Sequence, residues 1–430
     1  MLQISLTALD KSLNIKAAAV LVSILGWVIF TSVALTNVAV LGLVLLAPFA
    51  WVEFVKTNGA IESGTKAFLG LILALCAWDV LTNLIAGHGV GASMSAFLHG
   101  MRKLGFVLVL WAIFLKPSIA RIAFWAVCSA VLTLATINLL MTLSGVQAQG
   151  EYFTTGHMHL SYMSHMYGQA LVGLVFVLAQ MYLVRPALSW RVLVPLALLV
   201  MSLFLASERR TGYVLLLAGF GLWALLNAKR FNASKYKWWF LLAVLAVVIA
   251  AANSGVVHKR MAQALVEVSE YLAMSPQERV NAVGAVRIRM QYVITVIEAI
   301  KQSNWWVGMG SIDLPSAYQS AAIKIGLEPG TYAWEKYNWS NPHNEYLYML
   351  ATKGVIGLVL YLMIFAQACR VAWGKTDEVQ RISLVMFVFL FMLSITTNSM
   401  MIDMEEGHFT MLILLIFLAP QKLNLVAEKD

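Results

Sequence analysis

A histidine between two asparagines is the strongest candidate for chemistry in the sequence. It stands in Asn341-Pro342-His343-Asn344, at the start of a long apolar run. Asparagine suits an N-cap and proline the first helical position, so we expect His343 in the first turn of a helix. The positive end of a helix dipole disfavours a charged imidazolium. A neutral histidine there could act as a general base, although a histidine that only hydrogen-bonds at the start of a helix has the same pattern.

Two adjacent arginines, Arg209 and Arg210, lie between two apolar runs with almost no loop around them. Arginine at the edge of a membrane costs free energy and is usually paired or functional. Its planar fork suits a diphosphate. Glu208 could pair with one of the two arginines, but it cannot account for both.

Two further arginines, Arg287 and Arg289, belong to a predicted helix from 286 to 302. At about 100° per residue, one face is apolar and consists of Val286, Met290, Val293, Val296, Ile297 and Ile300. The opposite face consists of Arg287, Gln291, Thr295, Glu298 and Gln302. Arg289 falls on the apolar side, where a cation needs an anionic partner, whereas Arg287 falls on the solvated side. The two arginines point about 200° apart, so only one can reach a given anion, and the pattern favours Arg289.

Three histidines, His157, His159 and His165, precede another apolar run. A metal site is possible, but no carboxylate or cysteine stands beside them. We interpret this stretch instead as part of a cavity lip that contacts sugar hydroxyls.

The acidic cluster Asp403, Glu405 and Glu406 could hold a divalent cation, bind a sugar or be solvated. No P-loop, HExxH or GxSxG motif is present. Taken together, a histidine base and deep arginines without an acidic pair for a metal fit a lipid-linked diphosphate donor. We expect neither a metal nor a cofactor.

Membrane helices must position these residues, because 60% of the 430 residues are apolar and only 12% are charged. Most of the apolar runs are long enough to cross a hydrocarbon core of about 30 Å, and the run at 104–116 is short. This excludes a soluble enzyme and a disordered chain, and the continuity of the runs excludes the alternating strands of a β-barrel. We expect an all-α polytopic membrane protein with about twelve transmembrane helices, at residues 15–34, 37–54, 66–86, 104–116, 119–142, 165–184, 192–207, 212–228, 238–253, 344–368, 381–398 and 407–420.

Lysine and arginine are unevenly distributed between the two sides of these spans. If the N-terminus is cytoplasmic, the cytoplasmic segments hold seventeen of them, and the short loops on the other side hold four: Arg102, Lys103, Arg209 and Arg210. The positive-inside rule therefore predicts that both termini are cytoplasmic. It also explains the net charge of +9 without nucleic acid as a partner.

One connection is far longer than the others. The chain divides into helices one to nine (1–253), a loop domain with helices on the outer face (254–343), and helices ten to twelve (344–430). Long structured loops on a rigid scaffold often carry function. We therefore expect the active site on the outer, periplasmic side.

The histidine motif reads His-Asn-Glu-Tyr-Leu at 343–347 and is followed by Lys-Gly-Val-Ile-Gly at 353–357. A Gly-Met-Gly stretch at 308–310 follows the loop arginines, and Arg210 begins a predicted helix before Tyr213. In these motifs, over roughly residues 200–370, the sequence resembles the family of O-antigen ligases and polymerases.

The resemblance implies a multi-pass glycosyltransferase of the bacterial inner membrane, similar to the GT-C class. Its donor would be undecaprenyl diphosphate carrying O-antigen, and its acceptor a sugar of the lipid A core. The attack would be inverting and independent of metal. Membrane lipids would be its other partners.

We assign His343 as the general base, with Arg210 and Arg289 on the leaving diphosphate. The residues expected to bind substrate are Arg209, Arg287, Asn341, Asn344, His165 and Tyr213.

Two alternatives stay open. An O-antigen polymerase or a protein O-oligosaccharyltransferase would differ only in the acceptor. A lipid or polysaccharide transporter would be expected to show broken helices or buried charge pairs. Asp79 is the only acidic residue deep in a span, and a lone charge gives a transporter weak support.

Overall fold

The computed structural model describes residues 2–57, 59–144, 165–185, 189–206, 210–233, 255–275, 278, 285–327, 329–330, 334–335, 339, 341–396 and 404–419. Every regular element in these ranges is helical. The predicted span 238–253 lies outside them.

The chain before the long connection forms two groups of helices. The first group is α1 (Leu2–Val28), α2 (Val33–Lys56), α3 (Ser63–Ile85), α4 (Val90–Gly100), α5 (Arg102–Phe114) and α6 (Pro117–Leu143). The second is α7 (His165–Val184), α8 (Ser189–Met201) with a π-helical segment at Ser202–Ala206, α9 (Arg210–Leu226) and α10 (Ala228–Ala233). The groups meet where α6 packs against α7 and α8.

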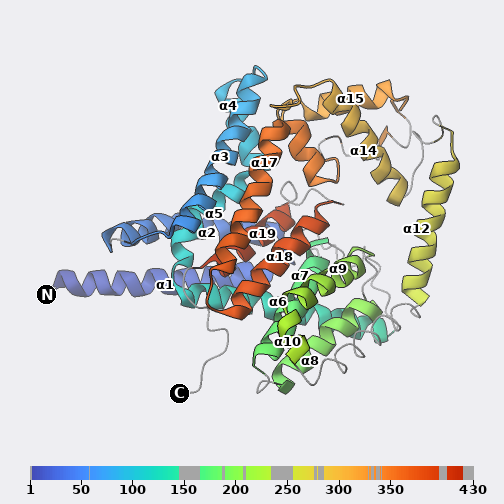
Figure 1. The fold of residues 1–430 in the computed structure, drawn as a ribbon. Coiled ribbons are helices and arrows are strands. Elements are labelled where there is room, and N and C mark those ends of the chain that lie inside the picture. Colours follow the sequence, from blue (N-terminus) through green and yellow to red (C-terminus); the bar gives the residue numbers. More distant parts are fainter. Residues whose placement is uncertain are drawn as a thin grey trace.

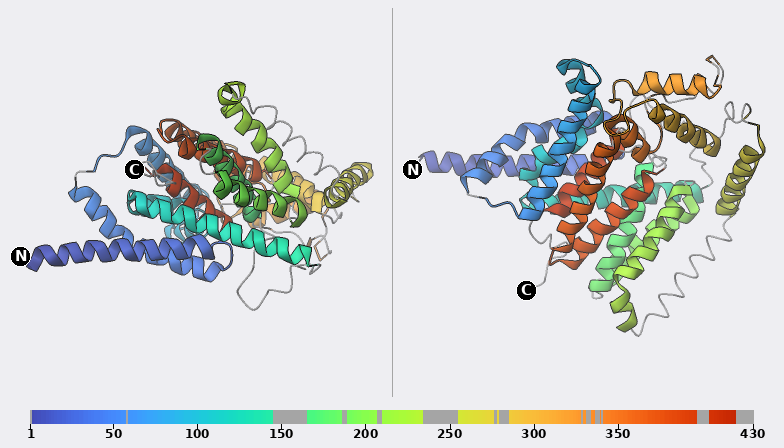
Figure 2. Two further views of the ribbon diagram at one scale, coloured as in Figure 1. Left: turned by 90° about the horizontal axis from the view of Figure 1, so that it is seen from below. Right: turned by 45° about the horizontal axis from the view of Figure 1, so that its top comes forward.

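The described part of the long connection contains helices. These are α12 (Gly255–Ala273), α14 (Ala285–Lys301) and α15 (Leu314–Lys324). Three apolar helices follow it: α17 (Glu345–Trp373), α18 (Glu378–Ser394) and α19 (Met404–Leu418). Figures 1 and 2 show α14 and α15 close to α17, and α12 at the edge of the molecule.

Four helices, α2, α3, α6 and α17, are long and apolar enough to cross a membrane. The pair α4 and α5 makes a fifth candidate if the two, bent by 75°, form one broken span. Shorter apolar helices include parts of α1, α7, α8, α9 and α19. These helices indicate an integral membrane protein of all-α class.

Two predicted boundaries in the first group were wrong. The turn expected at Thr36–Asn37 lies earlier, because α1 ends at Val28 and Ser32 caps α2 by accepting a hydrogen bond from Leu35 N at 3.3 Å. The short span expected from residue 104 is only the second arm of the bent pair, since α4 precedes it and the fully buried Met101 lies at the bend. A run of apolar residues locates helical chain but not the bend within it.

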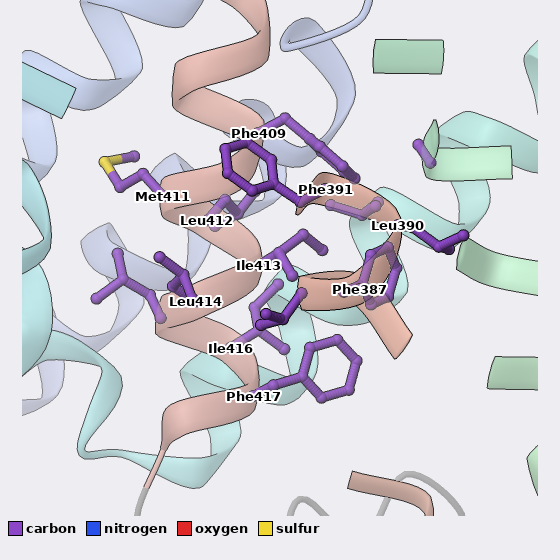
Figure 3. Close-up of a cluster of buried hydrophobic side chains, with 14 of the residues drawn as sticks. Phe387, Leu390, Phe391, Phe409, Met411, Leu412, Ile413, Leu414, Ile416 and Phe417 are labelled. Carbon is purple, nitrogen blue, oxygen red and sulfur yellow. The ribbon is translucent and has the colours of Figure 1, made fainter. Parts of the chain in front are cut away.

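Aromatic side chains fill the core between α18 and α19 (Figure 3). The ring centroid of Phe387 lies 6.2 Å from that of Phe409 and 5.6 Å from that of Phe417. Phe365 of α17 joins them through Phe391, with centroids 4.9 Å apart. The last three helices therefore pack as one unit, which sets the frame for the residues at the start of α17.

Candidate functional site at the start of α17

His343 lies just before α17, and not in its first turn as predicted. Asn344 is the N-cap and accepts a hydrogen bond from Leu347 N at 3.0 Å. Asn341, predicted as the cap, instead accepts a hydrogen bond from His343 N at 2.8 Å. His343 adopts a φ of 49°, a conformation uncommon for a residue with a side chain. The predicted cap at Asn341 was wrong, because the turn that Asn341 stabilises precedes the helix and the helix starts three residues later than expected.

The end of α18 holds this turn from the other side. Asn344 Nδ2 donates to Thr396 O at 3.0 Å, and Glu345 N donates to Ile395 O at 3.0 Å. Tyr346 Oη donates to Met392 O at 2.7 Å. Glu345 is fully buried in the first turn, where a helix dipole favours a carboxylate.

Tyr292 of α14 packs against His343, with ring centroids 5.0 Å apart. Tyr318 of α15 supports it by donating a hydrogen bond from its hydroxyl to Tyr292 O at 2.7 Å. The sequence interpretation missed Tyr292, although an aromatic residue three positions after Arg289 shares that arginine's side of a helix. This contact brings the loop helix with the arginines onto the histidine.

The two loop arginines point in different directions. Arg287 forms an ion pair with Glu270 of α12. Beside this pair, Tyr271 Oη donates to Gln291 Oε1 at 3.2 Å. Arg289 lies about 60° from Tyr292 around α14, whereas Arg287 lies about 140° away. Only Arg289 therefore shares the side of α14 that meets His343.

The predicted apolar face of α14 was partly wrong. Gln291 and Thr295 were expected in solvent but are buried, whereas Ile297 is 43% exposed. The buried face is rotated because α14 packs against α12, α15 and α17 together. The polar members are satisfied within this packing, as shown by the hydrogen bond from Thr295 Oγ1 to Gln291 O at 2.9 Å.

α14 is also tied to α15 through Glu298. Its carboxylate accepts hydrogen bonds from Lys324 of α15 at 2.5 Å and from Lys301 at 3.0 Å. These two hydrogen bonds, from Lys324 first, lower the pKa of the Glu298 carboxyl. Both lysines are mostly exposed to solvent, so the effect on stability is small.

α17 is kinked at Gly354, which has φ 63° and ψ −169°. In an unbroken helix, the N–H groups of Val355 and Ile356 would bond to the carbonyls of Ala351 and Thr352. Here the segment 305–310 satisfies all four groups. Val355 N and Ile356 N donate to the carbonyls of residues 305 and 306, and the N–H groups of residues 309 and 310 donate to the carbonyls of Ala351 and Thr352.

Glycines allow this segment, the strap 305–310, to enter the kink. A Cβ on Gly354 would lie 2.2 Å from Trp306 O, and one on Gly308 would lie 2.5 Å from Lys353 N. Gly308 also has a positive φ of 84°. The Gly-Met-Gly stretch and the glycine after Lys353 therefore belong to one backbone joint between the loop domain and α17.

Asp79 is not the lone charge that the sequence suggested. Lys353 Nζ lies 2.7 Å from Asp79 Oδ1, and both side chains are fully buried between α3 and α17. Lys353 Nζ also donates to Thr352 Oγ1 at 3.1 Å and lies 4.9 Å from the ring centroid of Tyr348. The lysine within an apolar run was the signal that could have predicted this partner.

The remaining predicted residues are described only in part. Arg210 begins α9 and His165 begins α7, and only their backbones are described. Tyr213 of α9 stacks on Phe204, with ring centroids 5.7 Å apart. The predicted residues Arg209, His157, His159 and Asp403 lie outside the described residues, as do the side chains of Glu405 and Glu406. Within the described part of the chain, no three His, Cys, Asp or Glu side chains are grouped to hold a metal ion.

This arrangement offers an imidazole at a helix N-terminus, with an arginine helix packed against it. An imidazole can take a proton from a hydroxyl group. The N-terminus of α17 and a guanidinium group both favour phosphate oxygens. The chemistry that fits is attack of a hydroxyl on a centre that carries a phosphate leaving group.

Residues 195–362 match a family model described as O-antigen ligase. No curated protein matches the chain. Members of this family are ligases and polymerases of lipid-linked glycans. The matched stretch contains α9, α14, the strap 305–310 and the kinked part of α17, and so includes Arg210, Arg289 and His343. The similarity to the O-antigen ligase family model therefore covers the part of the chain that holds all three of these residues, 195–362 of 430.

Proposed function

We propose that this protein is an O-antigen ligase that transfers O-antigen from undecaprenyl diphosphate to a sugar of the lipid A core. The observation that carries the proposal is the packing of Tyr292, on the arginine helix α14, against His343 at 5.0 Å. It supports a site that combines a base and a diphosphate-binding cation. The family of residues 195–362 supplies the substrate class.

In this mechanism, His343 takes the proton from the acceptor hydroxyl as its oxygen attacks the anomeric carbon of the donor sugar. The bond between that carbon and the diphosphate oxygen breaks, and undecaprenyl diphosphate leaves with the electron pair. Arg210 and Arg289 stabilise the charge that develops on the diphosphate. Attack opposite to the leaving group inverts the anomeric configuration.

Arg209, Asn341, Asn344, His165 and Tyr213 are proposed to bind the substrates around this centre. Asn341 and Asn344 are supported by their hydrogen bonds, which fix the backbone on both sides of His343. Arg287 is the weakest member of the proposed set, because its ion pair with Glu270 directs it toward α12.

The proposed setting is the bacterial inner membrane, with twelve spans and both termini in the cytoplasm. The loop domain 254–343 would then lie in the periplasm, where the lipid carrier presents the finished O-antigen. The uneven distribution of lysine and arginine supports this orientation.

The lipopolysaccharide of a deletion strain tests the proposal. Loss of a ligase leaves lipid A core without any O-chain, while polymer accumulates on the lipid carrier. A core with a single O-antigen repeat would identify a polymerase instead. Normal lipopolysaccharide with an unglycosylated membrane or secreted protein would identify a protein O-oligosaccharyltransferase.

A transporter is the second candidate, because the kink of α17 and the buried Asp79–Lys353 pair are features that transporters also use. The purified protein in liposomes separates the two. A ligase joins donor and acceptor placed on the same side of the membrane, whereas a transporter moves the lipid-linked glycan across it and forms no new glycosidic bond.

A further inference from the structure

The ion pair between Lys353 and Asp79 takes no part in the proposed reaction, yet it is fully buried, with a distance of 2.7 Å between Nζ and Oδ1. Asp79 Oδ2 accepts no hydrogen bond from any residue that the structure describes. Removing two charges from water costs free energy that their attraction only partly returns, and apolar replacement of such a pair is often neutral. Stability alone is therefore a poor explanation for these two residues.

The kink of α17 suggests another role. In a straight helix, backbone hydrogen bonds would fix the orientation of the first turns relative to the rest of the helix. Here the backbone bonds across residues 351–356 go to the strap 305–310 instead. The first half of α17, residues 345–353, therefore depends on contacts outside its own helix for its orientation.

Both ends of this short helix are held. At the N-terminal end, Asn344 and Glu345 donate to the carbonyls of Thr396 and Ile395, which directly follow α18. At the C-terminal end, Asp79 holds the Lys353 side chain, and Trp78 Nε1 donates to Lys353 O at 2.9 Å. α3 therefore holds the C-terminal end of the segment 345–353, whose N-terminal end lies beside His343.

α3 also holds the chain directly after the strap. Asn83 Nδ2 donates to Ser311 Oγ at 3.2 Å, and its Oδ1 accepts from Ile312 N at 3.2 Å. Asn83 lies one helical turn after Asp79 on the same face of α3. One face of α3 therefore locates both the histidine segment and the chain that leads from the arginine helix.

We propose that Asp79 and Lys353 are positioning residues for transfer. Their ion pair sets the first half of α17 against α3, and this sets His343 relative to Tyr292 and Arg289 on α14. The inference rests on the proposed role of His343 as the base.

The test replaces both members by apolar residues of similar size, Asp79→Leu with Lys353→Met. Removing both charges avoids the uncompensated charge that either single substitution would leave. Thermal unfolding of the purified protein in detergent, kcat, and KM for the acceptor are compared with those of the wild type. The reversed pair, Asp79→Lys with Lys353→Asp, is measured alongside.

We expect the apolar pair to unfold close to the wild-type temperature, with kcat lowered about tenfold to a hundredfold, because small misplacements of a catalytic group have effects of this size. KM should stay within about twofold, because the substrate contacts are not removed. The reversed pair should recover part of kcat relative to the apolar pair. Wild-type kcat in the apolar pair would overturn the proposal, and so would loss of the folded protein, which would assign the pair to stability.

Another interhelical ion pair provides the control. Glu53 of α2 and Lys116 at the start of α6 lie 2.9 Å apart, and both are partly exposed. The pair Glu53→Leu with Lys116→Met should keep kcat within about twofold; an equal loss of kcat in this control would contradict a specific role for Asp79 and Lys353. If the proposed function itself is wrong, the wild-type protein shows no transfer at all. Failure of the positioning proposal alone leaves wild-type transfer intact, so the two failures are distinguishable.

Discussion

At the scale of single residues, hydrogen bonds made by the neighbouring asparagines fix the backbone conformation of His343. Asn341 bonds to the N–H of His343, Asn344 caps α17, and the φ of 49° between them is sterically costly. Strained residues persist only where their surroundings over-determine them, and they are common at active sites. The two asparagines provide that surrounding here.

Replacing His343 with alanine removes the proposed base and little packing. Transfer should fall by about 10²–10⁴-fold, the usual contribution of general acid–base catalysis. Binding of the donor lipid and thermal unfolding should change little. Turnover of purified wild-type and His343→Ala protein at neutral pH checks this, and equal rates would eliminate the base assignment.

The two loop arginines make a matched pair of substitutions on one helix. Arg289→Gln should lower transfer by about a hundredfold and weaken donor binding, because a charge on the leaving diphosphate is lost. Arg287→Ala should affect transfer much less. It should instead weaken the contact of α14 with α12 and lower the free energy of unfolding by about 1 kcal/mol or less, as for a partly exposed ion pair. An essential Arg287 beside a dispensable Arg289 would show that α14 presents its other side to the donor.

Transfer should survive EDTA. Metal-dependent transfer from a lipid diphosphate needs hard oxygen ligands, usually two or more carboxylates. Asp403, Glu405 and Glu406 are the acidic candidates in the sequence, and nothing in the sequence links them to His343. Activity that is lost in chelator and restored by magnesium or manganese would make this cluster a metal site.

At the scale of elements, the strap 305–310 and the kinked α17 form one joint. The strap follows α14, the helix of Arg289, and the first half of α17 follows His343. The backbone bonds between them therefore couple the positions of the two proposed catalytic groups. A glycine is needed at the centre, because Gly354 occupies a region of φ and ψ that other residues almost never adopt.

Gly354→Ala should destabilise the protein by about 2–4 kcal/mol, from backbone strain together with the clash of the new methyl group against the strap. Gly70→Ala in α3 is the control, because no atom lies within 4 Å of its added Cβ. That substitution should be neutral or stabilise by about 0.5–1 kcal/mol. Thermal unfolding in detergent measures both, and equal stability of the two variants would mean that the joint tolerates a side chain.

The existence of most elements could be predicted from the sequence, but their joints could not. Apolar runs located most of the membrane helices. The helical wheel of α14 was partly wrong about which side is buried, and its preference for Arg289 over Arg287 stays a prediction. The sequence interpretation placed the cap at Asn341, but Asn344 caps α17. The two asparagines have the same capping propensity, and the bond of Asn344 to Thr396 is a contact between distant parts of the chain that leaves no local pattern. In the same way, Asp79 looked isolated because its partner is 274 residues away, and pairing at that separation leaves no local pattern.

At the scale of the whole molecule, the helices differ in length and several are bent. α4 and α5 meet at 75°, and α17 is kinked near its first third. Apolar helices shorter than a bilayer is thick can still serve as spans if they are extended by neighbouring chain or if the bilayer thins around them. The number of membrane spans, expected to be twelve, therefore depends on how the helices lie in the bilayer as well as on helix length.

Orientation gives the last prediction, which is that residue 57 is cytoplasmic and residue 320 periplasmic. Seventeen lysines and arginines on one side against four in the short loops on the other make this the favoured orientation, since basic segments are retained in the cytoplasm. Thr57 and Ser320 are both exposed in the structure. Thr57→Cys and Ser320→Cys are therefore each made in a background without the native Cys76, Cys128 and Cys369. The two variants are labelled in parallel. A membrane-impermeant maleimide should label residue 320 in cells with a permeabilised outer membrane, and residue 57 only after the inner membrane is opened. The reverse pattern would put His343 in the cytoplasm, where it could not meet a donor presented to the periplasm, and would contradict both the topology and the proposed ligase.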